Sequence, residues 1–157
     1  MKKPKFTLTQ HAGAFDALMA QADHRTLGVW AKACAERVLP HFAAAFPDDP
    51  RPRQALETLQ AWIDTGEFSM KVIRGASLGA HAAAREVGAD TPARSAARAC
   101  GQAVATAHVR THAPGAALYA LQAIHRASDA AEVEAALAAE RAWQRESLRA
   151  LIAERTD

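Results

Sequence analysis

The sequence is poor in the residues that build β-sheets and disulfide frameworks. Among its 157 residues, one is Tyr, two are Cys and eleven are Val or Ile. β-branched and aromatic side chains favour strands, so this scarcity argues against an extensive sheet. The two cysteines, Cys34 and Cys100, are also too few for a disulfide framework, and we expect a reducing, cytoplasmic setting.

Long apolar runs are missing as well. The chain opens with MKKPK, which is typical of the basic start of a signal peptide, but no long apolar run follows it. A signal peptide needs roughly 7–15 apolar residues at that point, and a membrane-spanning helix needs about 20 in succession. We therefore expect neither export by a signal peptide nor a membrane partner.

Neither sign of charge is in large excess. Lys and Arg number 19 against 17 Asp and Glu, which gives a formal charge of +2 and a pI near 8.7. Nucleic-acid-binding domains usually have a clustered basic face and a higher pI, so a nucleic-acid partner is not expected. Arg141, Arg145 and Arg149 form a basic ridge, but Glu140 and Glu146 interrupt it, which favours a solvated helix face.

Alanine dominates what is present, with 41 residues. Alanine is the best helix former, and its small side chain lets helices pack closely. Half of the residues are hydrophobic, which is enough for a folded core and excludes a disordered chain. The composition therefore predicts an all-α fold.

Apolar periodicity and capping residues predict a single-domain bundle of about six to seven helices over residues 1–157. Asp23, Ser69 and Thr91 are expected N-caps. Pro40 is expected to kink or end the second helix, because proline removes one backbone hydrogen bond. The expected helices cover residues 9–22, 24–46, 54–65, 70–87, 92–112, 116–127 and 130–154.

Two helix faces are predicted to share one core. Trp30, Cys34 and Val38 recur at spacings of four on the second helix. Leu59 and Trp62 belong to the apolar face of the third helix. We expect these two faces to pack against each other.

The segment RGASLG at residues 74–79 contains two glycines but is not a phosphate-binding loop. It lacks the order of glycines, the lysine and the preceding strand that such a loop requires. Gly75 and Gly79 lie one helical turn apart. We therefore predict that they form a packing surface where another helix crosses closely.

Histidine spacing raises the question of a metal site. His108 and His112 are four residues apart, which would place them on one helix face, and His81 could join from the neighbouring helix. A zinc site normally needs three or four protein ligands, and the glutamate of the HExxH motif is missing. We favour structural or partner contacts, and predict no metal.

No catalytic group is evident. Cys34 lies on the apolar stripe of its helix, and Cys100 is about two helical turns from His108, too far for a hydrogen bond within one helix. No serine stands in a GxSxG context. We predict a non-enzymatic protein without a cofactor.

One group of polar residues stands out, on the fourth and fifth expected helices. If the two helices meet, these residues form a cationic seam. One interpretation is that the seam is internal, satisfied by Glu86, Asp90 or backbone carbonyls, as buried polar groups usually are. The other is that it receives a carboxylate or phosphate from a ligand or partner. The seam candidates are His81, Arg85, Arg98, His108 and His112.

The proline-rich segment at residues 46–53 carries a second set of candidates, Asp49, Arg51 and Arg53. Adjacent aspartates can bind magnesium or transfer protons. At a loop-to-helix junction they more often cap the helix and pair with nearby arginines, which is the interpretation we favour. All three residues remain candidates for binding a partner.

Several segments together resemble the Imm-five-like putative immunity proteins, a bacterial family associated with polymorphic toxin systems. The resemblance covers about residues 27–125. Its parts are WAKACAERVLPHF at 30–42, PDDPRPRQALETLQAW at 47–62, AHAAAREVG at 80–88 and ARACGQAVATAHVRTHAPGAALYA at 97–120. The polar positions that match are Glu36, Arg37, Asp49, Arg51, Arg53, His81, Arg85, Arg98, His108 and His112.

This resemblance implies a helical bundle that binds and neutralises a cognate toxin without performing chemistry. The partner would be the toxin protein, and the chain itself would be a monomer or a homodimer. Immunity proteins that block basic nucleases are commonly acidic, so the toxin need not be a nuclease. The alternative is a small helical enzyme, or a metal- or anion-binding protein, that uses His81, His108 and His112.

Overall fold

Helices make up all of the regular structure in the part of the chain that is described. The computed structural model describes residues 1–156, and this part of the chain contains no strand, which confirms the all-α prediction. None of its helices is long and apolar enough to cross a membrane. The elements are the 3₁₀ helices η1 (Leu8–His11) and η2 (Arg110–His112) and the α-helices α1 (Asp16–Met19), α2 (His24–Ala45), α3 (Arg51–Thr65), α4 (Met70–Glu86), α5 (Pro92–Ala105), α6 (Ala113–Ala127) and α7 (Val133–Thr156).

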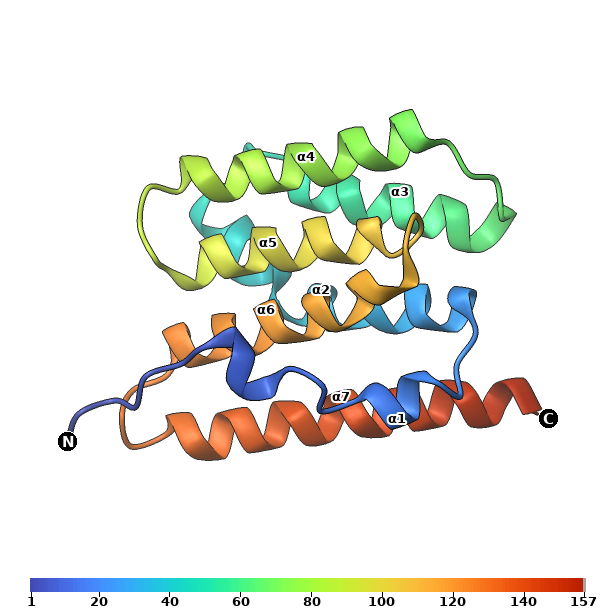
Figure 1. The fold of residues 1–157 in the computed structure, drawn as a ribbon. Helices are drawn as coiled ribbons and strands as arrows, with labels where there is room; N and C mark the ends of the chain where they lie inside the picture. The colour runs from blue at the N-terminus through green and yellow to red at the C-terminus, as the bar shows by residue number, and fades with distance from the viewer. Residues whose placement is uncertain (157) are drawn as a thin grey trace.

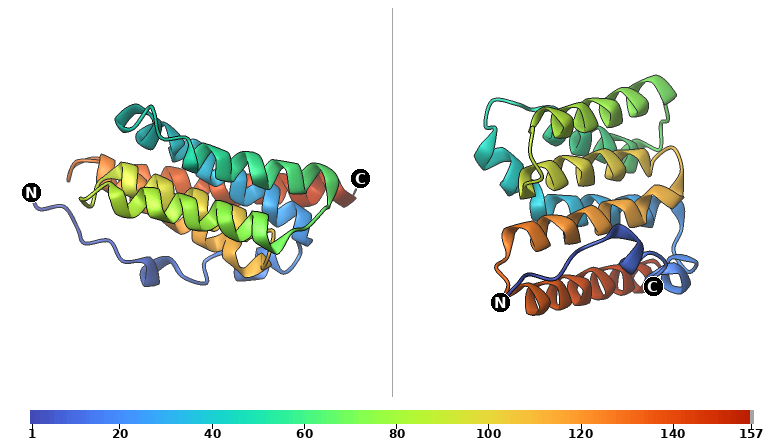
Figure 2. Two further views of the ribbon diagram at one scale, coloured as in Figure 1. Left: turned by 90° about the horizontal axis from the view of Figure 1, so that it is seen from above. Right: turned by 60° about the vertical axis from the view of Figure 1, so that its left-hand side comes forward.

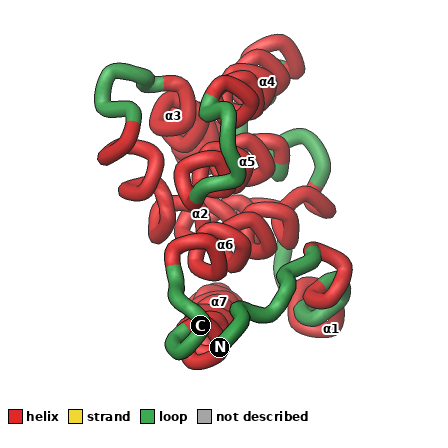
Figure 3. Tube along the Cα trace, turned by 90° about the vertical axis from the view of Figure 1, so that its left-hand side faces the viewer, coloured by secondary structure: helices red, strands yellow, loops and turns green. Residues whose placement is uncertain are grey.

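The long helices stack in rows, with α4 along one edge and α7 along the opposite edge (Figure 1). Between them, α5 contacts α2, α3, α4 and α6 and so lies at the centre of the molecule. The end-on view shows α3 beside α4, and α1 beside α7 (Figure 3). Seen from above, the main helices run roughly along one common direction (Figure 2). Because the main contacts of α4 are with α3 and α5, one side of this helix stays open to solvent.

The N-terminal segment crosses α6 and α7 on one side of the bundle (Figure 1). Lys3 anchors it by donating from Nζ to the carbonyl oxygens of His125 and Ser128, at 2.9 and 3.1 Å. Further along, His11 Nδ1 lies 2.9 Å from Nη1 of Arg141. The arginine ridge on α7 therefore holds the N-terminal segment at Arg141, and its remaining members stay partly or fully solvated.

The predicted contact between the second and third helices is confirmed. Trp30, Cys34, Val38 and Leu59 are fully buried in one apolar cluster, and Trp62 packs against it. The Trp30 indole also donates to the backbone carbonyl oxygen of residue 144 at 2.8 Å. This hydrogen bond joins α2 to α7 through the core.

Two of the three predicted capping residues form their side-chain caps. Asp23 Oδ1 accepts a hydrogen bond from the Thr26 amide at 2.8 Å at the start of α2, and Ser69 Oγ accepts from the Val72 amide at 3.3 Å at the start of α4. Thr91 stands at the start of α5, but its predicted side-chain cap is not formed. Its hydroxyl oxygen is buried without a hydrogen-bond partner among residues 1–156.

Two expected helices are shorter than predicted. The helix expected over residues 9–22 is divided into η1 and α1, because the intervening Gly13 adopts a left-handed φ of +80°. The fifth helix ends at Ala105 and not near His112. Tertiary contacts shape residues 106–112 instead: Arg110 donates to the backbone carbonyls of Met19 and Ala22 at 3.1 and 2.8 Å.

Two expected breaks fall inside helices. Pro40 does not end α2, which continues to Ala45. Since Pro40 is exposed, the Glu36 carbonyl that lacks its helical partner can bond to water. Residues 113–115, expected to separate the helices over 92–112 and 116–127, form the first turn of α6, where Pro114 needs no amide hydrogen.

The packing surface predicted at Gly75 and Gly79 is wrong. A Cβ added at either position would have no neighbour within 4 Å, since both glycines lie on the open side of α4. Close helix contact occurs at Gly101 on α5, where an added Cβ would lie 2.6 Å from Nε2 of His81. The glycine that lets α4 and α5 approach is therefore on the other helix.

Candidate functional site

The contact between α4 and α5 brings together two of the predicted seam residues, His81 and Arg98. Nη1 of Arg98 lies 2.9 Å from Nδ1 of His81. Arginine can only donate, so Nδ1 accepts and the ring proton of the neutral imidazole lies on Nε2. The imidazole ring rests against Gly101, where a side chain would leave it no room. His81 is therefore held in one tautomer and one position.

The surroundings of His81 are strongly cationic. Burial is the main cause that lowers its pKa to about 4, and the charges of Arg98, Arg85 and His112 lower it further. The imidazole is accordingly neutral at pH 7. Arg85 is exposed and forms no hydrogen bond or ion pair with residues 1–156. Arg98 is bonded to a neutral ring, and neither arginine forms an ion pair with a carboxylate of residues 1–156, although the charge of Arg85 helps to lower the pKa of the neighbouring Glu86.

The other two seam candidates lie apart from this contact. His112 Nδ1 is 3.0 Å from Oε1 of Gln102. His108 is exposed, and its ring stacks on Phe68 with centroids 5.9 Å apart. Because α5 ends at Ala105, the prediction that His108 and His112 share one helix face is wrong.

A metal site is not formed by these histidines. Within residues 1–156 no group of three or more His, Cys, Asp or Glu side chains is placed to hold an ion. Nδ1 of His81 and Nδ1 of His112 each face a different side chain, Arg98 and Gln102. The metal form of the alternative function therefore finds no support in the geometry.

The cysteines are not placed for nucleophilic chemistry. Both are fully buried. Burial raises the pKa of Cys100 to about 12 and raises that of Cys34 well above its ordinary value. A thiolate is the reactive form of cysteine, so these side chains act as small apolar groups.

The predicted loop candidates form an ion-pair network at the start of α3. Nη2 of Arg51 lies 2.6 Å from Oδ2 of Asp49, and the same guanidinium pairs with Glu86 at the end of α4. Arg51 donates to both carboxylates, and these hydrogen bonds lower the pKa of Asp49 and the pKa of Glu86. The network places the loop at the same end of α4 as Arg85. Arg53 is exposed and lines a groove of about 700 Å³ between α2 and α3.

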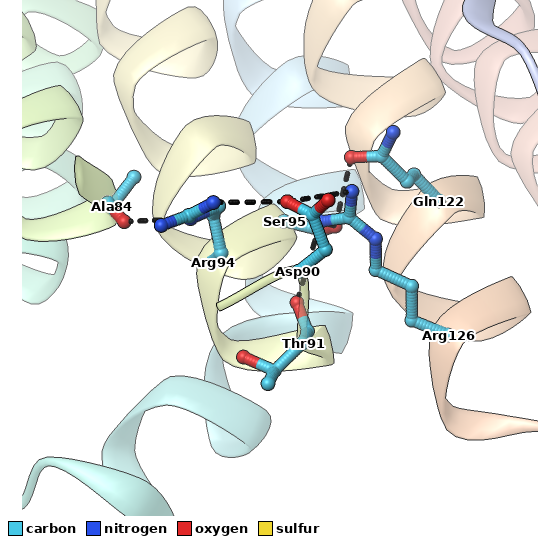
Figure 4. Close-up of polar contacts among 7 residues, drawn as sticks. All are labelled: Ala84, Asp90, Thr91, Arg94, Ser95, Gln122 and Arg126. Atoms are coloured by element: carbon cyan, nitrogen blue, oxygen red, sulfur yellow. Dashed lines mark hydrogen bonds and ion pairs between the residues drawn. The ribbon is translucent and has the colours of Figure 1, made fainter. Parts of the chain in front are cut away.

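A further polar cluster, which the sequence analysis did not identify, joins α5 to α6 (Figure 4). Oδ1 of Asp90 lies 2.9 Å from Nη1 of Arg94 and 3.5 Å from Nη2 of Arg126. Arg126 also donates to the Ser95 hydroxyl at 2.8 Å, and this hydroxyl donates to Oε1 of Gln122 at 2.9 Å. Burial lowers the pKa of Arg126. The cluster is internally paired and joins helices, which makes it structural.

Asp90 thus neutralises a different pair of arginines from those of the seam. The four-residue spacing between Asp90 and Arg94 is a sequence signal that could have revealed one of its contacts. No such signal exists for Arg126, which follows Asp90 by 36 residues. As a result, the α4–α5 seam keeps its unpaired positive charge.

An apolar groove lies next to the seam. It encloses about 330 Å³ between α4, the end of α5 and η2. Leu78 and Met70 on its rim are 54 % and 43 % exposed. No acidic residue lines it; the lining residues are Met70, Ile73, Arg74, Ser77, Leu78, Ala105, His108 and His112.

Most of the chain matches one known protein family. The family described as Imm-5 like putative immunity protein matches residues 17–151. The chain belongs to this family. The match extends beyond the 27–125 segment that carried the resemblance, taking in α1 and much of α7. No curated protein and no solved structure matches the chain significantly.

Proposed function

We propose that this chain is an immunity protein that binds a cognate bacterial toxin and neutralises it without catalysing a reaction. The family match over residues 17–151 is the observation that carries the proposal. The toxin is a protein partner that the chain meets in the cytoplasm. Its activity need not be that of a nuclease, because the chain is not acidic.

The geometry supports a binding role better than a catalytic one. Both cysteines are buried with raised pKa values, the acceptor nitrogen of His81 is engaged by Arg98, and its other ring nitrogen lies against Gly101. A general base must reach a substrate proton, and a nucleophile needs an activating base beside it. These features favour a rigid surface for docking over a reaction centre.

The binding residues proposed for this role are the seam and the neighbouring loop. His81, Arg85 and Arg98 lie together where α4 meets α5. Asp49, Arg51 and Arg53 lie near the same end of α4, because Arg51 pairs with Glu86. His108 and His112 border the adjacent apolar groove.

Co-expression tests this function directly. Toxin-like domains encoded beside the gene for this chain are produced from an inducible promoter in a laboratory bacterium, with and without the chain. We expect one of them to arrest growth alone and to be tolerated when the chain is present. A frameshifted copy of the chain's gene controls for the burden of expression.

The growth assay distinguishes an immunity protein from a small enzyme or a metal- or anion-binding protein. Restored growth together with a stoichiometric complex of the purified proteins supports neutralisation by binding. Growth arrest that persists despite soluble expression of the chain overturns it, as does a gene neighbourhood without any toxin domain.

A further inference from the structure

We infer that the open face formed by α4 and the adjoining part of α5 is where the toxin docks, and that it receives an acidic segment carrying an apolar side chain. This α4–α5 face consists of Arg74, Leu78, His81, Arg85 and Arg98. The inference rests on the proposed function and adds to it the surface and the chemistry of the partner.

Unpaired charge is the first argument. Arg74 and Arg85 form no hydrogen bond or ion pair with residues 1–156, and Arg98 bonds only to the neutral His81. The carboxylate of Glu86, the acidic residue of α4, is already engaged by Arg51. Arg37, Arg94 and Arg126, by contrast, each pair with an acidic side chain. The face therefore offers guanidinium groups that a partner's carboxylates can satisfy.

The apolar groove beside these arginines is the second argument. Leu78 and Met70 stand at its rim, and Ile73 and Ala105 line it. Gly79, next to Leu78, has nothing within 4 Å of an added Cβ, so the backbone of α4 is open to close approach. Protein interfaces commonly combine a buried apolar anchor with arginines at its edge. A single Leu- or Phe-sized side chain flanked by carboxylates suits this surface.

Other occupants fit less well. A second copy of this chain would place the same arginines opposite one another in a two-fold interface, and like charges there oppose association. Nucleic acid would need a longer basic track, whereas the groove that continues this face is apolar and the chain carries only +2 overall. An acidic protein segment satisfies both parts of the face.

The experiment measures binding of the purified toxin domain that the co-expression assay identifies. Arg85→Glu and Leu78→Asp change exposed side chains of the face. Arg149→Glu is the matched control, because it makes the same charge change on α7, where Arg149 pairs only with the exposed Glu146. Thermal unfolding of every variant establishes that it remains folded.

We expect Arg85→Glu to weaken binding about tenfold, equivalent to one unfavourable contact in place of a favourable one. Leu78→Asp should weaken it at least as much, and Arg149→Glu by less than about twofold. Added salt should slow association of the native chain with the toxin and have less effect on Arg85→Glu.

Each other outcome overturns the inference in a recognisable way. If the native chain binds the toxin and both face variants bind equally well, the toxin docks elsewhere and the proposed function stands. If the native chain does not bind, the proposed function fails and the inference fails with it. If a DNA or RNA oligonucleotide binds at low salt, and Arg85→Glu but not Arg149→Glu abolishes this while toxin binding is unchanged, the face is a nucleic-acid site instead.

Discussion

Arg37 on α2 and Glu140 on α7 form a bidentate ion pair, with Nε–Oε1 at 2.7 Å and Nη2–Oε2 at 2.9 Å. The two partners are buried to different extents. The Glu140 side chain is 6 % exposed, whereas the Arg37 side chain is 41 % exposed, with its Cζ 4.0 Å from the centre of the Trp143 ring. The hydrogen bond to Glu140 raises the pKa of Arg37. Without the ion pair, Arg37 could still be hydrated, whereas Glu140 would remain buried.

Removing Arg37 should lower the free energy of unfolding more than removing Glu140. Arg37→Ala leaves the Glu140 carboxylate buried without its partner, and we expect a loss of about 2 kcal/mol, reduced from the fully buried case by solvent access. Glu140→Ala leaves an arginine that can turn to water, at a cost of about 1 kcal/mol. Urea denaturation measures both, and equal losses would show that burial does not decide the effect.

Alanine at two helical glycines should act in opposite directions. Gly101→Ala places a Cβ 2.6 Å from the His81 ring, which Arg98 holds in place. We therefore expect the free energy of unfolding to fall by roughly 1–3 kcal/mol. Gly79→Ala meets nothing within 4 Å and should add roughly 0.5–1 kcal/mol through helix propensity. Thermal unfolding of the two variants compares them. Stabilisation by Gly101→Ala would contradict the close contact between α4 and α5.

The hydroxyl of Thr91 is expected to be dispensable. It is buried without a hydrogen-bond partner among residues 1–156, so Thr91→Val replaces an unsatisfied polar atom with a methyl group. We expect no loss, and a gain of up to about 1 kcal/mol. Ser69→Ala is the contrasting variant, because it removes the cap on the Val72 amide and should cost about 1 kcal/mol. Destabilisation by Thr91→Val would reveal a hydrogen bond to water or to another group.

His81 should make stability depend on pH in the mildly acidic range. Its pKa is about 4 in the folded chain against 6.5 as an ordinary value, so the unfolded chain binds more protons between these two values. The free energy of unfolding should therefore fall as the pH drops from 6.5 towards 4. His11, whose pKa burial also lowers, contributes in the same direction.

Denaturant titrations of His81→Gln at a series of pH values test this effect. The substitution should remove part of the slope between pH 6.5 and 4, because glutamine does not titrate. His108→Gln controls for loss of an exposed imidazole. A slope that His81→Gln leaves unchanged would assign the pH dependence to other groups.

Local sequence features determine most of the helices. Asp23 and Ser69 cap α2 and α4 through bonds to amides three residues away, and the two core faces around Trp30 and Leu59 follow from repeats of three and four. Such interactions lie within one or two helical turns, so they can be predicted from the order of residues alone. Family membership follows from the same linear order.

Only the tertiary structure decides where α5 ends and which polar groups meet. Arg110 reaches the carbonyls of Met19 and Ala22, about 90 positions earlier, and this contact helps to keep residues 106–112 out of the helix. His81 contacts Arg98, as the seam prediction expects. His108, which the prediction also included, lies apart and stacks on Phe68, because α5 ends at Ala105. Asp90 joins Arg126 and not the seam. These pairings depend on how each helix is rotated against its neighbours. Many small packing contacts together set that rotation, and no local sequence pattern encodes it.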